Sequence, residues 1–319
     1  MPRGFLRTLL AIPDRDVTFE TRGFQAAPKG QRARLENIGR TFVTGYHNAL
    51  DYRDAKLEER LAQVDLDDRG FAFEGAAMAL AILDAINPFR KRLDSWMAGP
   101  ARPHEYMTLV GAGWAIARIP WHRVRAERRA RAMHPFLWPL AIDGFGFHQG
   151  YFHASNLAEV SKPKGLDSDL GRSAYDQGLG RSFWFSCGAD PWKIAETMDA
   201  YDQRRRRDLW SGAGLACAYA GGVSADEVRV FTRLAGAFAP AAGQGACFAA
   251  KARLRAGNPA AHTDMACRIL CGISASEAAQ LSDQTYAVTA DLNGDYRDWC
   301  RFLQSRLEAV GTPAKVRNR

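Results

Sequence analysis

The chain has 319 residues, of which 47% are hydrophobic, and a formal charge of +8 at neutral pH. This is ample apolar material for one large packed domain or two smaller ones. The six cysteines form no CxxC pair, and the longest apolar run, residues 75–83, is far shorter than the roughly 20 residues of a membrane span. These features argue against a zinc site and a transmembrane helix, so we expect a cytoplasmic protein without metal or cofactor.

The chain divides into three parts by composition. Residues 1–40 are rich in Gly, Pro and Arg, and we expect an irregular N-terminal arm there. In residues 41–305 apolar residues recur with helical spacing and strand-like alternation is absent, which predicts an all-α domain. The first helices are expected at residues 34–50, 55–64, 71–86, 105–119 and 124–133. Residues 306–319 form a basic tail that we expect to fray.

A glycine motif recurs seven times along the chain at steps of 30 to 36 residues. The copies are marked by Gly45, Gly75, Gly111, Gly144, Gly178, Gly212 and Gly245. Such a period is typical of repeat architectures, so we predict an array of paired helices with a repeat of about 34 residues. It is either an open solenoid or a closed α/α toroid. A glycine inside a helix costs about 1 kcal/mol relative to alanine, and we interpret its recurrence as a means for neighbouring helix backbones to approach closely.

Two positions of the repeat, one residue before and three residues after the glycine, share one helix face. The first position holds Thr44, Glu74, Val110, Asp143, Gln177, Ser211 and Gln244, and the second holds Asn48, Met78, Trp114, Phe147, Arg181, Leu215 and Phe248. Stacked in neighbouring helices, they would form an aromatic surface with a few polar groups, as small-molecule pockets have. The alternative is that the polar residues only bind backbone amides at helix starts.

From this surface and from nearby residues of the same helices we select candidate site residues. The substrate-binding candidates are Trp114, Phe147, Asp176, Gln177, Arg181, Trp184, Ser211 and Gln244. The catalytic candidates are Glu74, Asp143 and His148. Burial in an apolar pocket raises the pKa of a carboxyl group, which makes Glu74 and Asp143 candidates for acid–base work.

Arg181 stands in the second position, where most other copies are apolar. An unpaired charge in an apolar interior is very costly. We therefore predict that Arg181 lies in the interior and makes a bidentate bond to Asp143 or Asp176, as a planar guanidinium favours.

Three other patterns have simpler interpretations. The spacing of His148 and His153 does not suit a metal site on one helix face. The DxDD string at residues 65–68 resembles the proton-donating motif of class II terpene cyclases, but no isoprenoid-diphosphate motif accompanies it, and we interpret it as a solvated turn. The arginine-rich stretches 123–131 and 204–207 lack interleaved aromatic residues, so we expect solvated helix faces and no nucleic-acid partner.

Several long strings of the chain carry a family resemblance. They are GFAFEGAAMA, VGAGWA, DGFGFHQGYFH, DQGLGRSFWF, LACAYAGG and QGACFAAKAR. These strings resemble a bacterial domain-of-unknown-function family encoded in enediyne polyketide gene clusters, beside an integral membrane protein and a repeat-rich partner. The resemblance covers roughly residues 18–279. It implies an accessory role in the biosynthesis of a polyene-derived product, and it brings no established catalytic residues.

Three functions follow as hypotheses. The first is an accessory biosynthetic protein whose helical cavity binds a long apolar intermediate and assists its maturation, together with the membrane protein and the repeat-rich partner. The second is a cyclase-like enzyme for polyenes or isoprenoids, with an acid facing the cavity. The third is a scaffold without a small-molecule site, as many helical arrays are.

Overall fold

The computed structural model describes residues 3–154, 160 and 163–311, and every regular element in those ranges is helical. The expectation of an all-α protein is therefore confirmed over this part of the chain. The helices that carry the glycine motif are α3 (Lys29–Asp51), α5 (Arg69–Ile86), α7 (Glu105–Arg118), α10 (Pro139–Phe152), α12 (Asp169–Ser186), α14 (Gln203–Ala220) and α16 (Ala239–Ala256).

Shorter or peripheral helices connect and cover the motif helices. In the N-terminal half they are α1 (Arg3–Leu10), α2 (Phe19–Arg22), α4 (Asp54–Ala62), α6 (Arg92–Ala98), α8 (Pro120–Arg123) and α9 (Ala126–Arg131). In the C-terminal half they are α13 (Pro191–Asp199), α15 (Ala225–Ala235), α17 (Ala261–Leu270), α18 (Ala275–Asp291) and α19 (Tyr296–Gly311). Short 3₁₀ turns are η1 (Asp14–Val17), η2 (Arg102–His104) and η3 (Gly236–Phe238).

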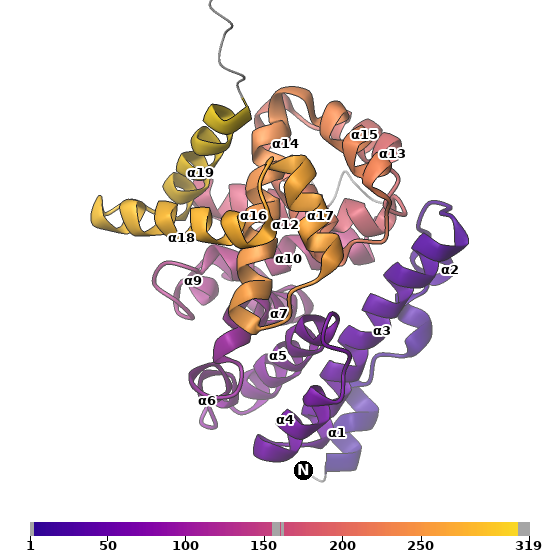
Figure 1. The fold of residues 1–319 in the computed structure, drawn as a ribbon. Helices are drawn as coiled ribbons and strands as arrows, with labels where there is room; N and C mark the ends of the chain where they lie inside the picture. Colours follow the sequence, from indigo (N-terminus) through magenta and orange to yellow (C-terminus); the bar gives the residue numbers. More distant parts are fainter. Residues whose placement is uncertain (1–2, 155–159, 161–162, 312–319) are drawn as a thin grey trace, which may run out of the picture.

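The motif helices pack against one another in chain order. Each of α3, α5, α7, α10, α12 and α14 contacts the next motif helix, while α13, α15 and α17 contact each other in succession. Figure 1 shows this progression from indigo helices at the lower right, through magenta, to orange helices at the top and yellow helices at the left. From α12 to α17 the chain thus alternates between a motif helix and a shorter helix.

Close backbone contact explains the glycines of the motif. In α12 a Cβ atom at Gly178 would overlap the carbonyl oxygen of Asp143 in α10, and one at Gly180 would overlap that of Leu209 in α14. In the pairs at residues 111/113, 144/146, 178/180 and 212/214 the first glycine therefore faces the preceding motif helix and the second faces the following one, whereas in the last pair it is Gly245, the second glycine, that meets the preceding helix. Helix pairs that pack this tightly cannot accept even an alanine without moving apart.

The first copy of the motif has a different register. Gly45 meets the carbonyl of Ala72, three residues before Gly75, which is the kind of contact that Gly180 makes with the helix after it. Gly75 in turn meets the carbonyl of Phe42 rather than that of Thr44. In its packing, Gly45 therefore corresponds to the second glycine of the later copies. Phe42 corresponds to the residue that precedes the first glycine in those copies, which is usually polar.

The two ends of the chain of motif helices approach each other. Gln31 at the start of α3 donates to Glu227 in α15 at 2.6 Å, and the Arg34 guanidinium donates to the carbonyl of Ala220 at the end of α14 at 3.0 Å. Arg253 near the end of α16 donates to the carbonyl of Asp67 just before α5, also at 3.0 Å. Helices far apart in sequence therefore border the same interior.

The caps expected for two covering helices are present. Asp190 accepts from the backbone of Trp192 and Lys193 and begins α13, with Pro191 at the first helical position. Ser224 begins α15 in a capping box with Glu227. These local signals could be recognised in the sequence because each satisfies otherwise unpaired N–H groups within one helical turn.

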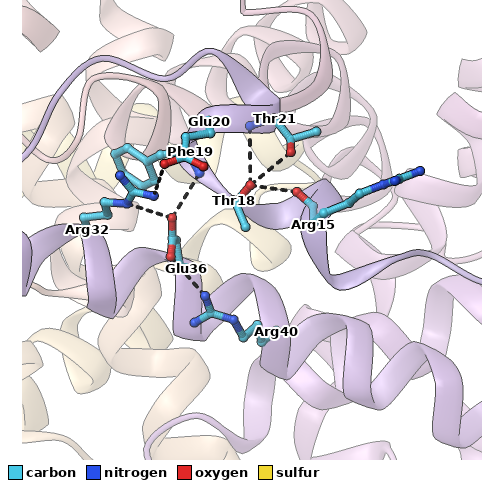
Figure 2. A network of polar contacts seen from close by, with 8 residues as sticks. All are labelled: Arg15, Thr18, Phe19, Glu20, Thr21, Arg32, Glu36 and Arg40. Carbon is cyan, nitrogen blue, oxygen red and sulfur yellow. Dashed lines mark hydrogen bonds and ion pairs between the residues drawn. The ribbon is translucent and has the colours of Figure 1, made fainter.

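The N-terminal region differs from the irregular arm that we expected. It folds as α1, η1 and α2, and α3 already begins at Lys29. Figure 2 shows how this region is fixed to α3: Glu36 accepts from the backbone of Phe19 at 3.1 Å and from Arg32 at 2.9 Å, and it pairs with Arg40 at 3.0 Å. These bonds outweigh burial and lower the pKa of Glu36.

At the other end, α19 continues the chain to Gly311, so the first part of the expected tail is helical. Residues 312–319, where we expect fraying, lie outside the described residues. None of the described helices combines the length and the apolar character that crossing a membrane requires.

Candidate functional site

An interior cavity lies between the motif helices. Over about 80 Å³ it admits the centre of a water-sized sphere, and a single water needs roughly 10–15 Å³ on that measure, so the cavity has room for more than one water-sized group. Most of its lining is apolar or aromatic. It comprises Ile12, Val17, Ile38, Gly39, Phe42, Val43, Phe71, Glu74, Tyr106, Met107, Val110, Trp114, Leu140, Asp143, Phe147, Tyr151, Phe152, Arg181, Phe185, Leu215, Ala216, Tyr219, Ala220, Phe248, Ala249, Lys251, Ala252, Tyr296 and Trp299.

The residues three places after the motif glycine supply one wall of this cavity. From α7 to α16 they are Trp114, Phe147, Arg181, Leu215 and Phe248, and all five line it. The rings of Trp114 and Phe147 are in contact, with their centroids 5.2 Å apart. From α7 to α16 this position therefore borders one cavity, whereas Asn48 and Met78, which hold it in the first two copies, are not part of the lining.

A buried charged group lies at the centre of the lining. Arg181 forms an ion pair through Nη1 with Asp143, and its Nη2 lies 3.8 Å from Oε1 of Glu74. Its guanidinium carbon is 4.8 Å from the centroid of the Phe147 ring. The indole N–H of Trp114 donates to the same Glu74 oxygen at 3.0 Å. We call Glu74, Asp143 and Arg181 the interior triad.

The interior triad has two carboxyl groups for one guanidinium, and all three side chains are buried. Burial raises the pKa of Glu74 to about 7, although Arg181 and the Trp114 hydrogen bond act in the opposite direction. Burial likewise raises the pKa of Asp143. Burial alone would lower the pKa of Arg181, but the two carboxylates outweigh it and raise the pKa. Burial therefore favours the protonated form of Glu74 far more than in an exposed glutamate, and this carboxyl group lines an apolar cavity.

Behind the triad, the residues before the later glycines form a hydrogen-bonded polar row. The row consists of Asp143, Gln177, Ser211, Gln244 and Gln304. Gln177 donates to Asp143 at 2.9 Å, Ser211 donates to Gln244 at 2.8 Å, and Gln304 in α19 donates to Gln244 at 3.2 Å. The predicted residues Gln177, Ser211 and Gln244 thus lie together, but behind the lining of the cavity rather than in it.

Arg181 agrees with its prediction in place and differs in geometry. It lies in the interior and contacts Asp143. Its two Nη atoms, however, contact two different carboxylates, Nη1 that of Asp143 and Nη2 that of Glu74, instead of forming a bidentate bond to one of them. The other candidate partner, Asp176, pairs bidentately with Arg205 at 2.8 and 2.5 Å. Asp176 and Arg181 are five residues apart, which turns their side chains to different faces of α12.

Two further predicted residues are buried outside the cavity lining. His148 packs its ring against Trp114 and Phe152, and burial lowers its pKa to about 3, so it is neutral at physiological pH. Trp184 donates its indole N–H to the carbonyl of Gly221 at 3.0 Å and packs against Phe231. These contacts give both side chains a place in the packed core.

The DxDD string is likewise outside the lining. Asp68 accepts from Arg34 at 2.9 Å and from Asn37 at 3.0 Å, which ties the start of α5 to α3. Among the described residues, no cluster of three or more His, Cys, Asp or Glu side chains has the arrangement of a metal site.

Several lining residues lie outside the positions predicted from the sequence. Tyr151, Phe185 and Tyr219 stand seven places after the motif glycine, two helical turns on, and could have been found by extending the repeat by one more position. Tyr296 and Trp299 come from α19, outside the repeat, and Ile12 and Val17 come from the N-terminal region. Their positions depend on tertiary packing that no local pattern encodes.

Residues 3–307 match the family described as "Protein of unknown function (DUF1702)", and the chain therefore belongs to this family. No curated protein and no solved structure shows significant similarity to the chain.

Proposed function

We propose that this protein binds a long apolar intermediate of the polyene type in the interior cavity and assists its maturation during natural-product biosynthesis. The observation that carries this proposal is the cavity itself, whose lining is drawn from most of the motif helices and consists mainly of apolar and aromatic side chains around a buried charged group. A slender conjugated chain fits such a lining by shape and by contact with aromatic faces, while the triad offers bonds to an oxygenated end.

The setting of this function is proposed from sequence resemblance. The resemblance to the family encoded in enediyne clusters supports a polyketide product. It also supports cooperation with a membrane protein and a repeat-rich protein encoded nearby.

We further propose that the motif helices form a closed α/α toroid with a repeat of about 34 residues. The bonds from Gln31 and Arg34 in α3 to α15 and α14 support closure, as does the bond from Arg253 to the segment before α5. A closed array encloses a cavity on all sides, which an open solenoid does not.

Binding of a fluorescent polyene tests the main proposal. In cis-parinaric acid the fluorescence of a conjugated tetraene rises on transfer to apolar surroundings, and we expect saturable binding to the wild-type protein. Leu215→Trp places a larger side chain in the cavity lining and should weaken binding by about tenfold or more, which is about 1.4 kcal/mol. Leu254→Trp, on the exposed face of α16, is the matched control and should bind as the wild type does. Absence of saturable binding, or equal binding by both variants, favours the scaffold hypothesis.

A second candidate function is acid-catalysed cyclisation of the bound polyene. The observation that favours it is Glu74, whose pKa near 7 keeps a proton available in an aromatic cavity. Glu74 would donate its proton to a terminal double bond, and aromatic faces would stabilise the cation. The carboxylate would recover a proton when the cyclised cation forms its new double bond, so the reaction is a net isomerisation.

Glu74→Gln separates the two candidates. The amide keeps an acceptor for Trp114 but has no proton of suitable acidity. If the protein only binds the polyene and assists its maturation, the variant should keep both its polyene affinity and that role. If the protein is a cyclase, the variant should keep its affinity but no longer form the cyclised product. Chromatography of the extracted polyene measures product formation.

A further inference from the structure

A surface cleft on the outer side of α12 gathers arginine side chains from three helices. The cleft has a volume of about 980 Å³ and lies between α12, α14 and α19. We call it the arginine cleft. Its charged lining consists of Arg172, Arg204, Arg205, Arg207, Arg297, Arg301, Asp169, Asp176 and Asp208.

Only part of this positive charge is paired within the described chain. Arg205 pairs with Asp176, and Arg172 pairs with Asp169 at 2.5 Å. Arg207 donates to the neutral Gln304 at 3.3 Å rather than to a carboxylate. With six arginines to three aspartates, the cleft keeps an excess of positive charge even when every aspartate is ionised.

Arg297 provides an independent sign of a missing partner. Its Nε and Nη2 atoms are buried and have no hydrogen-bond acceptor among the described residues. A buried N–H of a charged group without an acceptor is strongly unfavourable, so such atoms are normally found bonded. Arg297 also lines the cleft, so its guanidinium borders the space that an anion from solution would occupy, and a small shift of the side chain would turn the buried N–H groups toward that anion.

The chemistry of the cleft selects the acceptor. A guanidinium presents its N–H groups in a planar fork that matches the oxygens of a phosphate. Several such forks around one cleft suit a group with many oxygens and more than one negative charge. A single carboxylate would leave most of the charge unpaired.

We propose that the arginine cleft is a binding site for a phosphate or diphosphate group, held by Arg297 and Arg301 of α19 with Arg207 of α14. The group could be free, or it could be the head of a phosphorylated alkyl chain. The site is separate from the interior cavity and does not depend on the function proposed for that cavity.

Isothermal titration with inorganic pyrophosphate tests the site, with dodecyl phosphate as the second ligand. We expect one site per chain, with affinity that falls as NaCl is raised, because the contacts are between charges. Arg297→Gln and Arg301→Gln should each weaken binding by about tenfold or more. Arg233→Gln changes an exposed arginine on α15 outside the cleft, and should stay within about twofold of the wild type.

The cleft variants show whether the arginine cleft binds a phosphate group and which of the two ligands it takes. If Arg297→Gln does not fold, Arg301→Gln alone carries the comparison with Arg233→Gln. Arginine-dependent binding of pyrophosphate identifies the free group as a ligand, whereas arginine-dependent binding of dodecyl phosphate alone identifies a phosphorylated chain. The proposal is wrong if neither ligand binds the wild type at millimolar concentration, or if the cleft variants weaken binding no more than Arg233→Gln does.

Discussion

Helix α12 contributes to two charged sites that have opposite excesses. On its inner side Arg181 serves two carboxyl groups in a buried site, and on its outer side Asp176 pairs with Arg205 at the edge of a cleft with surplus arginines. The inner side chains are enclosed, whereas Arg205 is partly exposed. The comparison shows two ways to balance charge: a proton in the enclosed site, and an anion from solution in the open one.

Burial decides which of the two applies. An ion that must leave water pays a large desolvation penalty, so an enclosed carboxyl that shares its cation with a second carboxyl takes up a proton instead. This accounts for the pKa of about 7 at Glu74. An arginine cannot lose its proton at physiological pH, so a surplus of arginines can only be balanced by an anion.

Replacing Arg181 should have the largest effect on stability, because it removes the cation of the interior triad. Arg181→Met leaves Asp143 without its cationic partner in the core, and we expect a loss of about 3–5 kcal/mol in the free energy of unfolding at pH 8. The loss should be smaller at pH 5, where the two carboxyl groups can be protonated. Urea unfolding at both pH values measures it.

Arg205→Met is the matched control on the outer side. Its partner Asp176 lies at the edge of the cleft, where other arginines and water can compensate. We expect a clearly smaller loss than for Arg181→Met. Equal losses, or a wild-type melting temperature for Arg181→Met, would show that burial does not separate the two sites.

Glu74→Gln should change the pH dependence of stability. The pKa of Glu74 is about 7 in the folded protein, against an ordinary value of 4.5. The stabilisation from its bound proton is therefore complete below pH 4.5 and is lost as the pH rises through about 7. The wild type should lose about 3 kcal/mol more than the variant between pH 4.5 and 8, since one pKa unit corresponds to about 1.4 kcal/mol.

The measurement is the free energy of unfolding of both proteins across this range. Asp208, whose pKa burial raises to about 6, contributes to both curves, so only their difference reports Glu74. Two parallel curves would contradict a protonated Glu74.

These two sites also show what the sequence could reveal. The repeat identified Glu74, Asp143 and Arg181, because equivalent positions of packed, equivalent helices must stack on one surface. It could not separate Gln177, Ser211 and Gln244, which lie behind that surface, because a small rotation of each helix decides which residues face the cavity.

The outer site could not be recognised in the same way. The run at residues 204–207 has the composition of a solvated helix face, and nothing local relates it to Arg297 and Arg301 about 90 residues later. The cleft exists only because α19 returns to lie near α14. Similarly, the helical N-terminal region depends on bonds to Glu36 that its own Gly- and Pro-rich composition does not indicate.

A change at Gly178 tests whether helix spacing holds the inner site together. The added Cβ of Gly178→Ala would overlap the carbonyl of Asp143, so α10 and α12 must separate, and we expect a loss of about 1–3 kcal/mol. Gly30→Ala, in the first turn of α3 with nothing near its Cβ position, should be neutral or slightly stabilising. Thermal unfolding of the two variants distinguishes close packing from general helix propensity, which would favour alanine at both positions.

Replacing Ser211 should have the smallest effect on stability. Ser211 belongs to the polar row, which lies between the interior triad and the arginine cleft. Its hydroxyl donates to Gln244 at 2.8 Å, and Gln244 also accepts from Gln304, whose other amide atom meets Arg207 of the cleft. Ser211→Ala removes one buried hydrogen bond and should cost about 1 kcal/mol of unfolding free energy. Because Gln304 still binds Gln244, Arg207 should keep its place, so pyrophosphate affinity should be unchanged. A loss of affinity in Ser211→Ala would instead show that the row couples the interior to the arginine cleft, and that the two charged sites are one system.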